Sequence, residues 1–295
     1  MIFRLVTGIA GGLIICFALR EIYEDLFHPS ASGSLSGFVA TRIAKVMHWR
    51  VSLLPSVGPL SLVAVILCWA TLLVLGFGLI YWGYFPDHFH LNTGNSPSSE
   101  TGPLTAFYFS LAMLSGATFG DIAPQTQWLR FLVTVEALLG LMLVTASVSW
   151  IVLLYPALGR MRTLARRTAI LAASSEKTGI DVVSEGAEHL LSQLALDLVR
   201  TRVDLIHFPI IYYFYSSTEH SSLAHALPHL IHMADAGSKA SGDNRLKLDA
   251  AVLGTALDDL AEVLRRRFVR SPSEDSGAVF HAYAVDHAID AKTTN

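Results

Sequence analysis

Charged residues are scarce in this chain. They make up 15% of its 295 residues, where a soluble protein usually carries about 25%. No charged residue lies between Arg50 and Asp87, and Glu136 is the only one in residues 131–159. A helix of roughly 20 apolar residues crosses the hydrocarbon core of a bilayer. The pattern therefore excludes a wholly soluble protein, and the return of charge from Arg160 onward marks the start of a soluble tail.

Cysteine and the motifs of common enzymes are also nearly absent. Cys16 and Cys68 lie inside apolar segments, where cysteine behaves as a small apolar residue, so we predict neither a disulfide nor a cysteine metal site. The chain has no phosphate loop, nucleophile elbow or metalloprotease motif. It also lacks a basic stripe with interleaved aromatic residues. We expect no enzyme activity, no cofactor and no nucleic-acid partner.

Three apolar segments are candidates for membrane spans: residues 5–19, 57–84 and 128–158. The first makes only about 22 Å of helix, although flanking arginines can extend its reach. A secretory signal and a retained helix are both open for this segment. No small-residue cleavage site follows it, which favours the retained helix, and Gly8, Gly11 and Gly12 would allow close helix packing.

Lysine and arginine predict the orientation of the chain in the cell membrane. Residues 20–50 carry four of them, residues 83–129 carry none, and residues 160–167 carry four arginines. Cytoplasmic segments are enriched in these residues. We therefore expect a multi-pass protein with its N-terminus and residues 85–127 outside and its tail in the cytoplasm. The arginine run could instead bind anionic lipid.

A short apolar stretch lies between the second and third spans. Residues 104–114 are too few to cross a bilayer and are typical of a re-entrant helix, with Pro103 in its first turn and Thr101 or Gly102 as its cap. Irregular backbone at this depth survives only where protein or water surrounds it. The carbonyl end of the helix would favour a cation. Acidic residues in the segment expected outside the membrane would also favour a cation, namely Asp87, Glu100 and Asp121. They would form an acidic mouth around a water-filled site.

The residues after this helix are Gly116, Ala117, Thr118, Phe119, Gly120 and Asp121. This layout resembles the pore loop of the potassium-channel superfamily, whose filter usually reads T-V-G-Y-G-D, and the likeness extends over residues 107–157. The resemblance implies an all-α membrane protein with three transmembrane helices, a re-entrant pore helix and a helical cytoplasmic tail. It further implies a homotetramer with residues 116–121 as the selectivity filter. Gly140 stands at about the spacing of the family's gating hinge.

Three filter positions depart from the family pattern. Gly116 stands where the family has threonine, Thr118 where it has glycine, and Phe119 where it has tyrosine. A β-branched residue such as Thr118 resists a positive φ angle. We therefore expect a cation channel of altered selectivity, with K⁺ as the first candidate among monovalent cations. The alternative is a membrane-anchored oligomeric sensor or scaffold with a vestigial pore domain.

Glu136 is the single charge deep inside a span, and a carboxylate there is a functional candidate by default. A functional Glu136 would be a partner of the pore helix behind the filter or a proton-sensitive element. Otherwise it is a neutral or hydrogen-bonded glutamate at a helix contact. Gly140, Leu143 and Ser147 share its helical stripe. The sequence leaves open whether that stripe faces the pore or the pore helix.

The chain divides into residues 1–51 (first helix and cytoplasmic loop), 52–159 (pore domain) and 160–295 (cytoplasmic domain). Leucine stripes predict helices in the tail, with a flexible turn at residues 236–244 and disorder over residues 271–295. His225, His229 and His232 are a weak candidate for a metal site, because Pro228 interrupts their helix and no further ligand stands at close spacing. A polar helix face or a pH sensor is the alternative. The ligand of the tail is unknown.

Overall fold

The computed structural model describes residues 1–27, 34–47, 54–91, 102–117, 119–183, 188–216, 221–240, 244–269 and 274–287. Contacts group the chain into two compact units. One unit holds residues 1–36 and 63–152, and the other holds residues 37–62 and 153–295. The predicted division at residues 51 and 159 stays a prediction, and each unit is described by itself.

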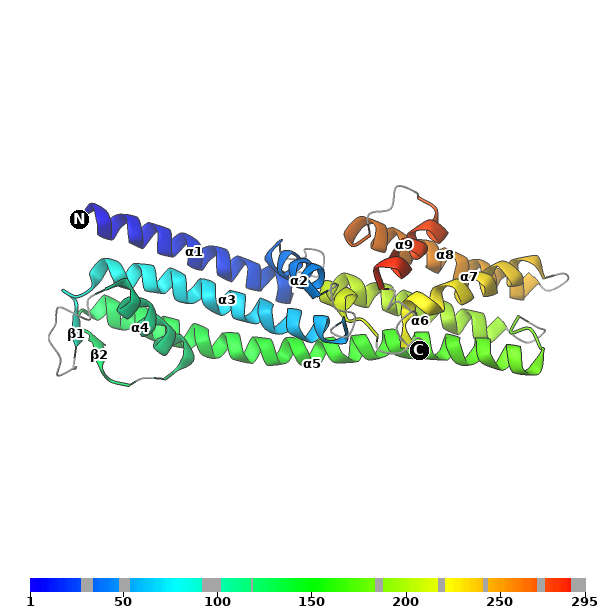
Figure 1. Cartoon of the computed structure of the whole chain (residues 1–295), viewed down its shortest axis with the longest axis horizontal. Coiled ribbons are helices and arrows are strands. Elements are labelled where there is room, and N and C mark those ends of the chain that lie inside the picture. The colour runs from blue at the N-terminus through cyan, green and yellow to red at the C-terminus, as the bar shows by residue number, and fades with distance from the viewer. Residues whose placement is uncertain are drawn as a thin grey trace. The chain divides into compact units, whose positions relative to one another are not determined.

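The first unit is built on three helices that are long and apolar enough to cross a membrane. They are α1 (Ile2–Phe27), α3 (Leu54–Tyr84) and α5 (Gln127–Thr178), of which the last two continue into the other unit. Figure 1 shows the three lying side by side, with the short helix α4 (Pro103–Ser115) at one end. The all-α membrane fold expected from the sequence is therefore present.

Glycine lets α1 approach α3 closely. A Cβ atom on Gly11 would lie 2.4 Å from the carbonyl oxygen of Gly76, so no side chain fits there. Near the helix ends, Phe3 packs edge-on against Trp82 with ring centroids 5.0 Å apart. Of the three glycines expected at this contact, Gly11 makes it, whereas Gly8 and Gly12 face open space.

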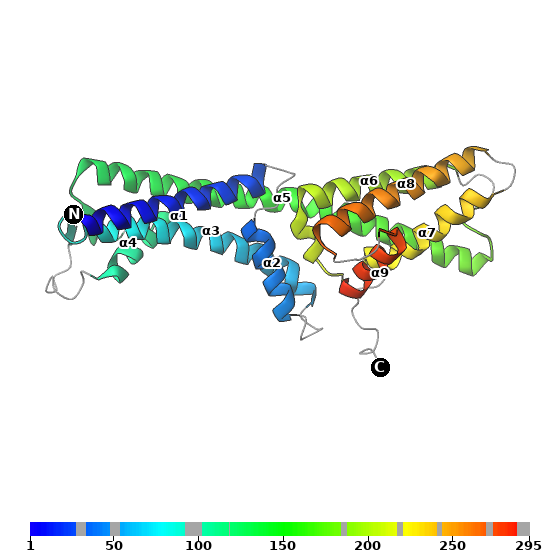
Figure 2. The ribbon, with the colours of Figure 1, turned by 90° about the horizontal axis from the view of Figure 1, so that it is seen from above.

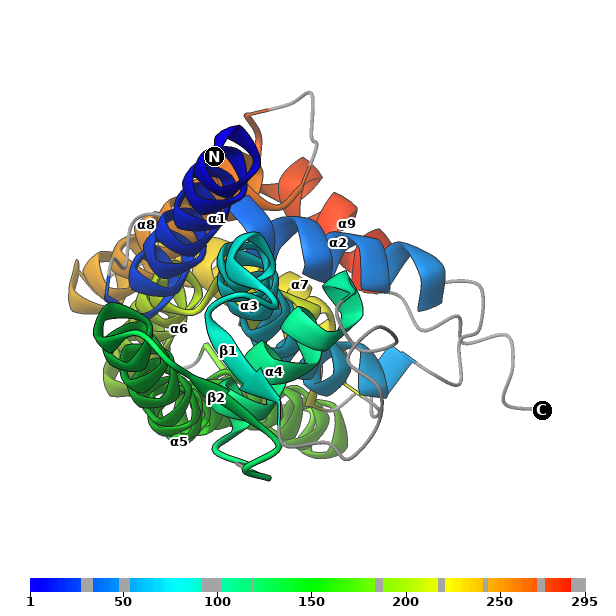
Figure 3. The same ribbon diagram turned by 90° about the vertical axis from the view of Figure 1, so that its left-hand side faces the viewer.

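A two-stranded sheet, which the sequence did not predict, flanks the pore helix. Strand β1 (Phe89–Leu91) pairs antiparallel with β2 (Ile122–Pro124), and Phe89 is opposite Pro124. The chain leaves this sheet after β1, passes through α4 and the turn that follows it, and returns in β2, as Figure 3 shows from the end. Predicted loop residues 92–101 lie outside the described part of the chain.

Helix α5 continues well beyond the predicted span. The sequence ends the span near Leu158, but the helix runs for 52 residues and includes Pro156. Alanine, leucine and arginine, which favour helix, are frequent in residues 160–173. In the second unit, Arg160 donates two hydrogen bonds to Asp204, at 2.8 and 2.7 Å, and Arg167 pairs with Asp197 at 3.0 Å. These pairs fix α6 (Glu188–His207) against α5.

The second unit is a helical bundle. Beside α5 and α6 it contains the 3₁₀ turn η3 (Pro209–Tyr213), α7 (Leu223–Lys239), α8 (Asn244–Arg267) and α9 (Ser276–His287). Figure 2 shows α6, α7 and α8 gathered along this part of α5. The predicted leucine stripes form the core, and its fully buried members include Leu194, Leu198, Leu253 and Leu260.

Three predictions about the tail are wrong. Helix α7 passes through Pro228 without a break, because its apolar face, including Leu227 and Leu230, is buried and tertiary packing outweighs the lost backbone bond. The same helix extends to Lys239, into the segment predicted as a turn. Helix α9 replaces predicted disorder, with Phe280 buried and residues 288–295 outside the described chain.

The predicted cytoplasmic loop contains α2 (Ser34–Met47), which the sequence did not indicate. Its residues 37–47 belong to the second unit. There the Thr41 hydroxyl lies 2.9 Å from that of Tyr213, and Ala44 packs with Val57 and Tyr215. The turn η3 therefore holds α2 and the first residues of α3.

Candidate functional site: the pore loop

The candidate filter begins where α4 ends. Gly116 caps the helix in the left-handed conformation, with φ of 74°, and its N–H donates to the carbonyl of Met113 at 3.1 Å. Gly120 adopts φ of 75°. Glycine takes such angles at little cost, so the two glycines bracket the turn at the places that need them. Thr118, the departure that the sequence made most conspicuous, lies outside the described residues.

Tyr108 of α4 supports the exit of the loop, and sequence reasoning missed it. Its hydroxyl donates a hydrogen bond to Asp121 at 3.1 Å. Its ring stacks on that of Phe119, with centroids 6.5 Å apart and planes 15° apart. The available signal was a tyrosine in the first half of a re-entrant helix whose loop ends in an aromatic residue and an aspartate. Two of the predicted filter residues are thus held by the pore helix itself.

Glu136 lies behind the loop, where α3, α4 and α5 meet. The side chain is fully buried. It accepts hydrogen bonds from the hydroxyl of Tyr81 on α3 at 2.6 Å and from that of Ser110 on α4 at 2.5 Å. A buried carboxyl group needs such partners to offset its lost hydration. The structure places Glu136 at a contact with α4, and its functional role stays a prediction.

Gly140 makes the closest helix contact at the site. A Cβ atom there would lie 1.9 Å from the carbonyl oxygen of Leu114, in the last turn of α4. Glu136, Gly140, Leu143 and Ser147 are all buried within the single chain. The stripe that they form faces the pore helix and α3, and the neighbouring face of α5 is exposed. Assignment of Gly140 as a gating hinge stays a prediction.

The N-terminal end of α1 is tied to the loop that precedes β1. Arg4 pairs with the carboxylate of Asp87, and its Nη1 lies 3.2 Å from Nε2 of His88. The backbone carbonyl of His88 in turn accepts from the N–H of Gln125, after β2, at 2.9 Å. From the sequence, Asp87 was expected to be one of the unpaired acidic residues that attract cations to the pore. Its pairing with Arg4 corrects that view, and Glu100 lies outside the described residues.

The tail histidines lie along one helix. His225, His229 and His232 are exposed on α7, and within the described ranges no three His, Cys, Asp or Glu side chains are placed to hold a metal ion. His220, which is near them in sequence, is not among the described residues.

Comparison with known families decides the nature of the site. Residues 62–154 match the family model described as an ion channel. These residues are an ion-channel pore domain. The match begins within α3, includes α4 and the candidate filter, and ends within α5. The chain is therefore a membrane protein with a pore domain of the potassium-channel superfamily. No curated protein and no solved structure matches it.

The ion-channel domain accounts for about a third of the chain. Helix α1 and the bundle after residue 154 lie outside the matched residues. The contacts of Arg4 and Gly11 therefore join a helix of unassigned role to the channel domain, within the same compact unit.

Proposed function

We propose that the chain forms a homotetrameric cation channel in the cell membrane, which conducts K⁺ or other monovalent cations through residues 116–121. The ion-channel family match over residues 62–154 is the observation that carries this proposal. One chain supplies one pore loop, and the resemblance to the potassium-channel superfamily implies four copies around an axis to enclose a path. The N-terminus is placed outside and the tail in the cytoplasm, and no cofactor other than the permeant ion is proposed.

The geometry around α4 supports conduction of a cation. The helix ends at Gly116, so its partial negative charge lies next to the filter. Tyr108 holds Asp121 at the exit, where a carboxylate attracts cations. Glu136 and Gly140 hold the inner side of the pore helix against α5.

An exposed apolar face of α5 supports assembly. Its exposed members include Leu138, Leu141, Val144 and Val148, all within a segment expected to span the membrane. Lipid or a neighbouring copy can cover such a face. In the proposed tetramer this face would contact the neighbouring copies and line the pore. Bending of α5 at Gly140 would open and close the pore.

The test is the reversal potential of the purified protein in a planar bilayer, with K⁺ on one side and Na⁺ on the other. A value near the K⁺ equilibrium potential would indicate a selective filter, and one near zero with clear current would indicate a non-selective cation pore. Stable monomers in mild detergent would contradict the proposal.

The alternative, a sensor or scaffold with a vestigial pore, is kept open by Thr118, which stands where the family has glycine. Absence of current in both the natural chain and Thr118→Gly, across varied pH and calcium, would favour this alternative. Current in the natural chain would favour the channel, whereas current in Thr118→Gly alone would mean that Thr118 disables the natural pore.

A further inference from the structure

The second unit contains a cavity that the channel proposal does not use. It has a volume of about 530 Å³ and lies between α5 and α7, where its lining runs from Ser222 to Met233, and residues 181 and 182 also line it. We name it the α5–α7 cavity. Binding sites for small molecules commonly enclose roughly 300–1,000 Å³, so its size suits a small organic ligand.

One wall of the α5–α7 cavity is apolar. Ala165, Ala169 and Ala172 line it from α5, and Met233 lines it from α7. Alanine at these positions leaves room that a larger side chain would fill. A ligand with a short hydrocarbon body can therefore lie along the wall.

The charged side chains around the cavity are acidic. Glu176 and Asp181 line it, and no lysine or arginine among the described residues does. One Asp181 oxygen accepts from the N–H of Val183 at 3.0 Å, whereas the Glu176 carboxylate has neither a hydrogen bond nor an ion pair within the described part of the chain. The field in the cavity therefore opposes an anion and favours a cation.

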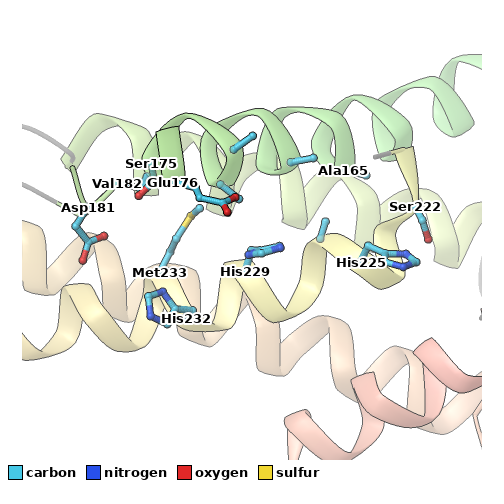
Figure 4. A pocket seen from close by; sticks show the side chains of 14 residues that line it. Ala165, Ser175, Glu176, Asp181, Val182, Ser222, His225, His229, His232 and Met233 are labelled. Atoms are coloured by element: carbon cyan, nitrogen blue, oxygen red, sulfur yellow. The ribbon is translucent and has the colours of Figure 1, made fainter. Parts of the chain in front are cut away.

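Side chains that can accept hydrogen bonds line the cavity from both helices. Figure 4 shows His229 and Glu176 pointing into the space between α7 and α5 from opposite sides. A carboxylate only accepts hydrogen bonds, and a neutral imidazole has one accepting nitrogen. The described residues offer no third ligand for a metal ion. An ammonium group, with its positive charge and several N–H donors, matches this pair.

We propose that the α5–α7 cavity binds a small organic amine in its ammonium form. The charged group lies between Glu176 and His229, and the hydrocarbon body lies against the alanine wall. Binding does not depend on ion conduction, so the proposal stands or falls independently of the channel function.

The test uses the full chain in detergent and three five-carbon probes of equal length: 1,5-diaminopentane, 1,5-pentanediol and glutarate. Isothermal titration calorimetry would measure their binding. We expect saturable binding of the diamine at one site per chain and none of the neutral or anionic probe. Equal binding of all three, or tighter binding of glutarate, would overturn the proposal.

Variants locate the site. We expect Glu176→Gln, at an exposed position, to weaken diamine binding about tenfold or more, because a charged hydrogen bond is lost. Ala169→Leu should weaken it by filling the wall while keeping helix propensity. Asp235→Asn is the matched control, since this exposed carboxylate of α7 does not line the cavity.

The control should bind the diamine as the natural chain does. Undiminished binding by Glu176→Gln would place the amine elsewhere, for example in the acidic pore mouth, and would refute the assignment. Size-exclusion chromatography and circular dichroism on each variant would separate a local loss of binding from misfolding.

Discussion

Replacing Gly140 by alanine would place a methyl group 1.9 Å from the carbonyl oxygen of Leu114. No side-chain rotation relieves this contact, because both atoms are fixed to helix backbones. The pore helix and α5 would have to separate by about 1 Å for the contact to reach even 3.0 Å. That movement would disturb the neighbouring hydrogen bond from Ser110 to Glu136, which joins the same two helices.

The expected cost follows from overpacking of a close helix contact, which typically destabilises a protein by about 1–3 kcal/mol. Alanine recovers up to about 1 kcal/mol through its higher helix propensity. We expect a net loss of about 1 kcal/mol, seen as a fall in Tm of roughly 2 °C or more. Thermal unfolding of the purified chain in nanodiscs, followed by circular dichroism, would measure it.

Gly159→Ala is the matched control. It introduces the same change in the same helix at a site with no atom within 4 Å of the new methyl group. Only the gain in helix propensity remains there, so we expect an unchanged or higher Tm. A Gly140→Ala protein as stable as this control would refute the close-contact reasoning. If the channel open probability of Gly140→Ala changed while its Tm did not, Gly140 would act only as a hinge.

Three further predictions concern hydrogen bonds near the filter. Glu136→Ala should lower stability by about 3 kcal/mol, because two buried hydroxyl groups lose their acceptor. Glu136→Gln should recover much of that loss in the same unfolding assay. Tyr108→Phe keeps the ring but removes the donor to Asp121, so we expect faster decay of current in bilayer recordings. Arg4 Nη1 lies 3.2 Å from Nε2 of His88. His88→Phe removes that nitrogen, so we expect faster hydrogen exchange at the start of α1 than in the natural chain at the same pH.

Contrary results for these three are equally specific. Equal stability of the Ala and Gln variants would mean that Glu136 is not a needed acceptor. Tyr155→Phe alters an exposed tyrosine of α5 and should leave current decay unchanged. An effect of the same size in both tyrosine variants would argue against support through Asp121. Hydrogen exchange at the same rate in His88→Phe and in the natural chain would mean that His88 does not hold the start of α1.

The sequence was sufficient to predict features that depend on residues close together in the chain. The absence of charge identified the membrane helices, and Pro103 correctly marked the start of the pore helix. The resemblance in residues 107–157 found the domain that the family match covers. Glu136 and Gly140 were also predicted to matter. Their contact residues could not be predicted, because these lie on α3 and α4.

Features that depend on distant residues were missed. Arg4 and Asp87 are 83 positions apart, and nothing in either local segment indicates the pair. Strands β1 and β2 contain three residues each, too few to show an alternating pattern. Pro228 was taken to end a helix that tertiary packing in fact maintains. Thr118 is outside the described residues, so its departure from the family pattern stays a prediction.

The ion pairs between α5 and α6 give the arginine run after the last span two successive roles. Asp204 is 44 residues later in the chain than Arg160, and Asp197 is 30 later than Arg167. A ribosome adds about 5–20 residues per second, so Arg160 emerges roughly 2–9 s before its aspartate has been made. In the proposed orientation, its full charge is available during that interval to retain the segment on the cytoplasmic side. The aspartate then neutralises it, and Arg160 becomes part of the folded bundle.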